Sequence, residues 1–148
     1  MPVELSRPPI ITNWVSYTPV TQGLGTISNV SLRWRRVGSN LEINGNLRVG
    51  TVTLVEARIH LPIGLLVFTQ NTIGGSETFG YLARDVSSVS ASLSLHSKNN
   101  FNYLNIGRMR SDISVNPLFP ELASNIIGNN EDVSIRTAIP IQGWNSNL

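Results

Sequence analysis

The sequence contains no cysteine, only one lysine and no long apolar run, and each absence excludes a class of protein. Without cysteine there are no disulfides, no thiolate nucleophile and no sulfur-ligated metal. The longest apolar run, residues 63–68, is interrupted by Gly64. It is far shorter than the roughly 20 residues that a membrane-spanning helix needs. We therefore expect no membrane insertion, and stabilisation by packing or association alone.

Positive charge is modest and scattered along the chain. The net charge is +2, and ten arginines accompany the single lysine, Lys98. Because general nucleic-acid binding needs clustered positive charge, we expect no nucleic-acid partner. Residues 1–12 contain Glu4 and the Pro8-Pro9 pair, where a secretory signal would need a continuous apolar region. We therefore expect the chain to stay in the compartment in which it is made.

Apolar and polar residues alternate in three successive runs within residues 26–61. A period of two indicates a strand with one buried and one solvated face. Because tight turns connect antiparallel neighbours, the runs predict a three-stranded meander. The alternation shifts by one at residues 54–55, which predicts a β-bulge or a strand bend. The members of the three apolar faces are Val30, Leu32 and Trp34; Leu41, Ile43, Gly45, Leu47 and Val49; and Val55, Ala57, Ile59 and Leu61.

Further strands are predicted at residues 14–18, 78–84, 89–96, 101–106 and 132–141, with one helical turn at most within residues 121–126. About eight strands without a long helix favour an all-β fold, specifically an antiparallel two-sheet sandwich of the jelly-roll type. The 148 residues suffice for one domain with a core. We place this β-sandwich domain at residues 14–148, after an extended, proline-containing N-terminal arm at residues 1–13.

The spacing of the titratable residues gives little sign of catalysis. His60 lies on the polar side of its run and His96 ends a serine-rich strand, so both are interpreted as solvated strand residues. No His-x-His or Glu-x-x-His spacing indicates a metal site. The adjacent carboxylates of Glu131 and Asp132 follow an Asn-rich turn, where acidic residues commonly serve turn geometry. We expect a non-enzymatic protein that needs no cofactor.

Three aromatic residues near the two ends of the predicted domain are candidate contacts. They are Trp14, Tyr17 and Trp144. Trp34, by contrast, continues the apolar side of its run, which predicts core packing. Rings with a polar edge suit stacking on a sugar or burial in a subunit interface, and the terminal Trp144 could equally seal the end of the sandwich. Glycan contact and subunit contact are therefore the candidate roles of these three residues, with packing at the end of the domain as the further alternative for Trp144.

Seven segments of the chain resemble the β module found in structural proteins of tailed bacteriophages and prophages. The likeness extends from Ile11 to Trp144 and is strongest in the first third. The segments are ITNWVSYTP (11–19), GLGT (23–26), LRWRRVG (32–38), LEING (41–45), GTVT (50–53), ARIHLPIG (57–64) and AIPIQGW (138–144).

This resemblance implies a jelly-roll-like homotrimer on the virion surface, assembled in the host cytoplasm. The expected function is that of a non-enzymatic virion structural protein, a trimeric knob of the tail-fibre, receptor-binding type or of the capsid-decoration type. Its expected partners are other virion proteins of the capsid or tail, and a host-surface glycan is a candidate ligand. The alternative function is a stand-alone, lectin-like carbohydrate-binding module.

The short arm is the part of the chain that would dock a small module to a particle. No long fibre shaft precedes the module in this sequence, only residues 1–13. An extended strap of this kind suits attachment to a capsid or tail protein. The candidate docking residues of the arm are Val3, Leu5, Arg7, Pro8, Pro9 and Ile10.

Overall fold

The protein is described by a computed structural model that covers residues 8–69, 77–86, 89–108 and 121–145. The residues that follow the alternating patterns form strands, and one helical turn lies between the last two of them. The elements are β1 (Val15–Ser16), β2 (Thr21–Gln22), β3 (Ser28–Val37), β4 (Asn40–Arg48), β5 (Arg58–His60), β6 (Glu77–Val86), β7 (Val89–Ser97), β8 (Tyr103–Gly107), α1 (Ala123–Ile126) and β9 (Asp132–Pro140).

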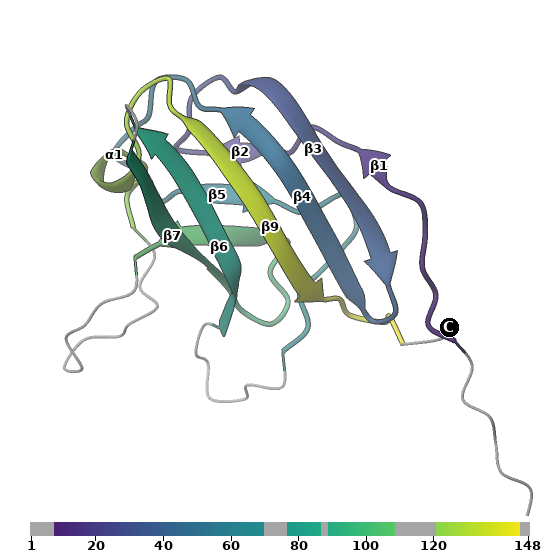
Figure 1. The fold of residues 1–148 in the computed structure, drawn as a ribbon. Coiled ribbons are helices and arrows are strands. Elements are labelled where there is room, and N and C mark those ends of the chain that lie inside the picture. Colours follow the sequence, from purple (N-terminus) through teal and green to yellow (C-terminus); the bar gives the residue numbers. More distant parts are fainter. Residues whose placement is uncertain (1–7, 70–76, 87–88, 109–120, 146–148) are drawn as a thin grey trace, which may run out of the picture.

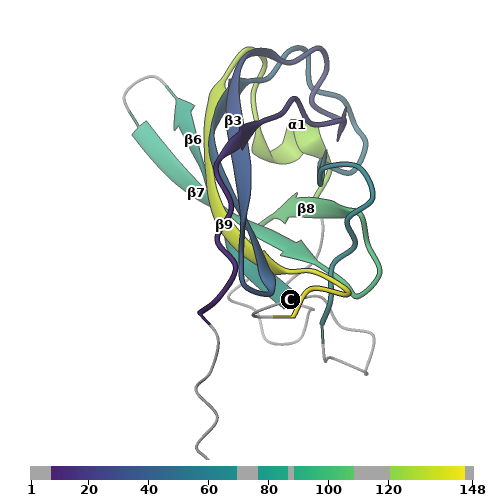
Figure 2. The same cartoon turned by 90° about the vertical axis from the view of Figure 1, so that its right-hand side faces the viewer.

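The nine strands form one antiparallel sheet in the order β1-β3-β4-β9-β6-β7-β8-β5-β2. The sheet curls, so that β8, β5 and β2 lie behind β3, β4 and β9 (Figures 1 and 2). The all-β, antiparallel prediction is confirmed. Two separate jelly-roll sheets are not confirmed, because hydrogen bonding continues through β7 and β8 from one half of the curled sheet to the other.

The predicted three-stranded meander is only partly correct. The β3–β4 hairpin forms, with Trp34 opposite Ile43. The third run, however, crosses to the other half of the sheet, where β5 pairs with β8 and β2. Strand β9 takes the place beside β4, with Ile135 opposite Gly45. The alternation specified which side chains are buried, but many strands share that pattern and it does not specify neighbours.

The core lies between the two halves of the curled sheet, and α1 lies at one end of it (Figure 2). Leu32 and Ile43 are buried and Trp34 packs against them from the inner side, as the alternation predicts. Residues 54–55 form an exposed bend outside the strands, so the shift in alternation marks a bend of the chain and not a β-bulge. The fully buried large side chains are Leu24, Leu32, Leu41, Ile43, Leu47, Ile59, Leu82, Leu95, Leu104, Ile106, Ile126 and Ile127.

The described part of the predicted arm runs along the edge of β3. The N–H of Gly38 donates to the carbonyl of Ile10 at 2.7 Å, and the N–H of Thr12 donates to the carbonyl of Arg36 at 3.0 Å. Pro8 and Pro9 are exposed and Ile10 is half-buried. Val3, Leu5 and Arg7 lie outside the described residues. Docking by the arm and the domain boundary at residue 13 stay predictions.

Candidate binding surface on the outer face of the sheet

Four polar or aromatic side chains form a row across the outer face of β3, β4, β9 and β6. Arg33 lies opposite Asn44, Asn44 opposite Arg136, and Arg136 opposite Tyr81. Directly opposed residues of antiparallel strands point to the same face. Their chain neighbours Leu32, Ile43, Ile135 and Leu82 are buried on the inner face. We call Arg33, Asn44, Arg136 and Tyr81 the polar row.

The polar row borders a shallow depression of about 500 Å³ on the same face. Tyr81 is 57% exposed, so its ring is available to a ligand. Amide, hydroxyl and guanidinium groups surround it, and these can hydrogen-bond to a polar molecule that lies across the strands. The residues that line the depression are Asn44, Gly45, Asn46, Tyr81, Ala83, Ser92, Ser134, Ile135 and Arg136.

Ion pairs flank the polar row along the strands. Arg35 contacts Glu42 at 3.1 Å, and Arg48 contacts Asp132 at 2.9 Å. The hydrogen bond from Arg48 lowers the pKa of the Asp132 carboxyl. Neither Arg33 nor Arg136 has an ion-pair partner within the described part of the chain. The row therefore carries positive charge between two neutralised pairs.

Trp14 continues the row beyond β3. The guanidinium carbons of Arg33 and Arg35 lie 4.8 Å and 4.6 Å from the centre of its ring. These cation–π contacts hold the Arg33 guanidinium over the Trp14 ring, beside the edge strand β1. Trp14 is half-buried. The polar row crosses three strand spacings from β3 to β6. Since neighbouring strands lie about 4.8 Å apart, its length is roughly 14 Å.

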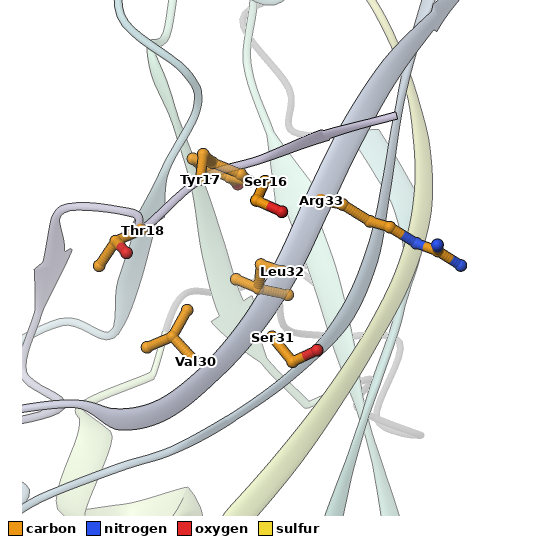
Figure 3. A pocket seen from close by; sticks show the side chains of 7 residues that line it. All are labelled: Ser16, Tyr17, Thr18, Val30, Ser31, Leu32 and Arg33. Carbon is orange, nitrogen blue, oxygen red and sulfur yellow. The ribbon is translucent and has the colours of Figure 1, made fainter. Parts of the chain in front are cut away.

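Tyr17 follows β1 directly and lies on the core side of β1 and β3. It lines a second hollow of about 390 Å³ between β1 and β3 together with Thr18 and Val30 (Figure 3). The Tyr17 ring packs against the core. Its hydroxyl is buried without a hydrogen-bond partner in the described ranges, and burial raises its pKa. In Figure 3 the side chain of Arg33 extends away from Tyr17 and Leu32.

Trp144 lies apart from the polar row and from Tyr17. Its ring is half-buried against the core, and the guanidinium carbon of Arg36 lies 4.9 Å from the ring centre. With Phe68 and Pro140 it lines a third hollow of about 460 Å³. The three aromatic residues singled out from the sequence therefore do not form a common site, and only Trp14 adjoins the polar row.

A second polar cluster lies on strands β5, β8 and β7. Arg58 contacts Glu56 at 2.9 Å and lies over the ring of Tyr103 at 4.2 Å. The side-chain amide of Asn105 also donates to Glu56. Opposite Asn105 lies His96, which is fully buried. The interpretation of His96 as a solvated residue is therefore wrong, because both faces of this part of β7 are covered.

The two histidines lie in different environments. Neither ring nitrogen of His96 has a hydrogen-bond partner among the residues that the structure describes. Desolvation lowers the pKa of His96, with Lys98 acting in the same direction and Glu56 opposing it. His60 is half-buried and packs beside Tyr103, with ring centres 5.6 Å apart. The described residues contain no group of three or more acidic or histidine side chains that could hold a metal.

The sequence patterns did not single out Tyr81, Asn44 and Arg136. Each lies in a predicted strand, and the alternation puts Asn44 and Arg136 on solvated faces. What was missing is the register that aligns β4, β9 and β6.

No helix of the described residues has the length and hydrophobicity to cross a membrane. No protein-family model, curated protein or solved structure matches this chain.

Proposed function

We propose that this protein is a non-enzymatic structural protein of a bacteriophage particle, a surface knob of the receptor-binding type that contacts a host-surface glycan. The observation that carries the glycan contact is the shallow depression beside exposed Tyr81. An exposed ring stacks on the apolar face of a sugar, while amides and hydroxyls bond to its hydroxyl groups. The resemblance to the phage module supports the virion location.

The proposal includes assembly as a homotrimer in the host cytoplasm. Several apolar side chains are exposed on the single chain, and those of Leu54, Val55 and Leu122 lie on adjoining segments beside α1. A closed cyclic assembly would cover such residues. In this proposal the two halves of the curled sheet correspond to the two layers of a jelly-roll-type module.

Solution mass tests the trimer. We expect a species of three times the chain mass of 16.2 kDa in sedimentation equilibrium at micromolar concentration. A monomer under these conditions would contradict the trimer.

Glycan binding tests the depression. The purified full chain is titrated against a panel of neutral and acidic bacterial surface polysaccharides. We expect binding that weakens at least tenfold in Tyr81→Ala and Asn44→Ala. Asn125→Ala is the matched control, because this exposed asparagine lies on α1, away from the polar row. Absence of binding to every glycan, or full binding by Tyr81→Ala, would refute the proposal.

The capsid-decoration type differs in what the arm does. If the arm docks the protein to a capsid or tail protein, then deletion of residues 1–13 removes it from particles while isolated-protein glycan binding is kept. Incorporation that is unchanged after the deletion would contradict docking by the arm. The electron-microscopic position of the protein on the particle then separates tail from capsid.

A stand-alone lectin is the second candidate function. One observation favours it: every residue of the polar row belongs to a single chain, so binding needs no second subunit. A monomer that binds a glycan with full affinity and is absent from particles would identify this alternative.

A further inference from the structure

We infer that the glycan held by the polar row is acidic, and that Arg33 and Arg136 bind carboxylate groups on its sugars. This inference rests on the glycan-binding function proposed above and adds the chemical class of the ligand. It depends on the charges of the polar row, on their separation, and on the rings at its two ends.

Arg33 and Arg136 are the charged members of the polar row. Both flank Asn44 in register, one on β3 and the other on β9. An arginine fork matches a carboxylate with two parallel hydrogen bonds. Neither guanidinium makes such a pair with a carboxylate of the described residues. Both forks are therefore available to an anion from outside.

Two of the three carboxylates near the row on this face are already paired, and the third, the exposed Asp85, lies at the far end of β6, four residues from Tyr81. Glu42, two residues from Asn44 on β4, accepts hydrogen bonds from Arg35, and Asp132 accepts two from Arg48. The polar row contains no acidic residue of its own. An acidic ligand would thus meet two uncompensated positive charges and no uncompensated carboxylate within the row, whereas a neutral ligand would gain only hydrogen bonds from the guanidinium groups.

Trp14 positions the first arginine before a ligand arrives. The ring lies 4.8 Å from the Arg33 guanidinium carbon and leaves its N–H edges free for hydrogen bonding. Holding a long side chain in place reduces the entropy lost on binding. Trp14 thus acts as a positioning residue for Arg33, while Tyr81 next to Arg136 offers a ring for a sugar.

The separation of the two arginines indicates a polymer rather than a single sugar. Their strands are two spacings apart, which is about 10 Å. One sugar ring does not bridge that distance while bonding to both forks. An oligosaccharide that carries carboxylates on several of its sugars does, when it lies across the strands from Arg33 towards Tyr81.

The test compares acidic glycans with their neutral counterparts. Oligogalacturonate, oligosialate, alginate and hyaluronan fragments are each titrated against the full chain, beside the same fragment with its carboxylates reduced to alcohols. We expect at least one acidic fragment to bind at least tenfold more tightly than its reduced form. Arg33→Gln and Arg136→Gln should each remove about tenfold of the affinity for the acidic fragment and weaken the binding of its reduced form by a smaller factor.

Two further variants separate charge from geometry. Lys98→Gln removes the same unit of charge from an exposed residue after β7 and should leave binding unchanged. Arg136→Lys keeps the charge but loses the fork, and should bind less well than the wild type. Circular dichroism and melting temperature verify that each variant is folded.

The possible outcomes distinguish the two levels of the proposal. Equal binding of acidic and reduced fragments would overturn the inference and leave glycan binding intact. Binding of an acidic fragment that survives both Arg→Gln substitutions would overturn the inference as well. So would binding that occurs only with glycerol-phosphate polymers, whose charges are phosphates and not carboxylates. No binding of any fragment, acidic or neutral, would instead refute the glycan-binding function itself.

Discussion

Two arginine–carboxylate pairs of nearly equal geometry differ in burial, and we expect only the buried one to stabilise the fold. Arg84 Nε and Nη2 donate to Glu131 at 3.0 Å and 2.8 Å, and Arg48 Nε and Nη2 donate to Asp132 at 2.9 Å and 3.1 Å. The Arg84 and Glu131 side chains are 23% and 13% exposed, whereas those of Arg48 and Asp132 are 45% and 51% exposed.

The perturbation is Arg84→Met, which keeps the apolar stem and removes the guanidinium. It leaves the largely buried Glu131 carboxylate without this partner, and the carbonyl of Ile126 at the end of α1 loses its donor. Breaking a fully buried pair costs about 3–5 kcal/mol. Because Arg84 retains some exposure, we expect about 3 kcal/mol of lost unfolding free energy. For a chain of this length that corresponds to a fall in melting temperature of roughly 6–12 °C.

Thermal and urea unfolding followed by circular dichroism measure the effect. Arg48→Met is the matched control, since its pair is solvated, and we expect no measurable change in its melting temperature. The double variant Arg84→Met/Glu131→Leu should lose less than the sum of the single variants, by more than about 1 kcal/mol. Equal shifts for Arg84→Met and Arg48→Met would refute the reasoning that burial decides.

Two other predictions concern backbone sterics and pH. Gly45 has φ +138°, and an added Cβ would lie 1.8 Å from the Ser31 carbonyl oxygen, so Gly45→Ala should lower the unfolding free energy by about 2 kcal/mol or more. Gly64→Ala, at φ +87° with nothing near the added atom, should cost less; equal losses in urea titrations would contradict the clash. Burial lowers the pKa of the His96 imidazole in the folded chain. On acidification the imidazole of the unfolded chain is therefore protonated first, and the unfolding free energy should fall as the pH drops below about 6.5. His96→Gln should flatten this dependence between pH 7.5 and 5.5, and an unchanged slope would exclude His96 as its source.

Local pattern was sufficient to predict most strands and their buried faces. The alternation of Leu41, Ile43 and Leu47 with polar residues is a property of neighbouring positions, and it appears unchanged in β4. The single helical turn at α1 was likewise visible as a short break in the strand patterns. These features follow from side-chain direction along an extended chain, which depends only on residue number.

The choice of strand neighbours was decided by tertiary structure. Strand β9 inserts between β4 and β6, although it is distant from both in sequence. That choice brings Asn44, Arg136 and Tyr81 into one row and buries His96. The sequence by itself determined which side chains avoid water, because hydrophobicity acts residue by residue. Only the folded sheet decided which polar groups meet, because register between distant strands depends on the packing of the whole core.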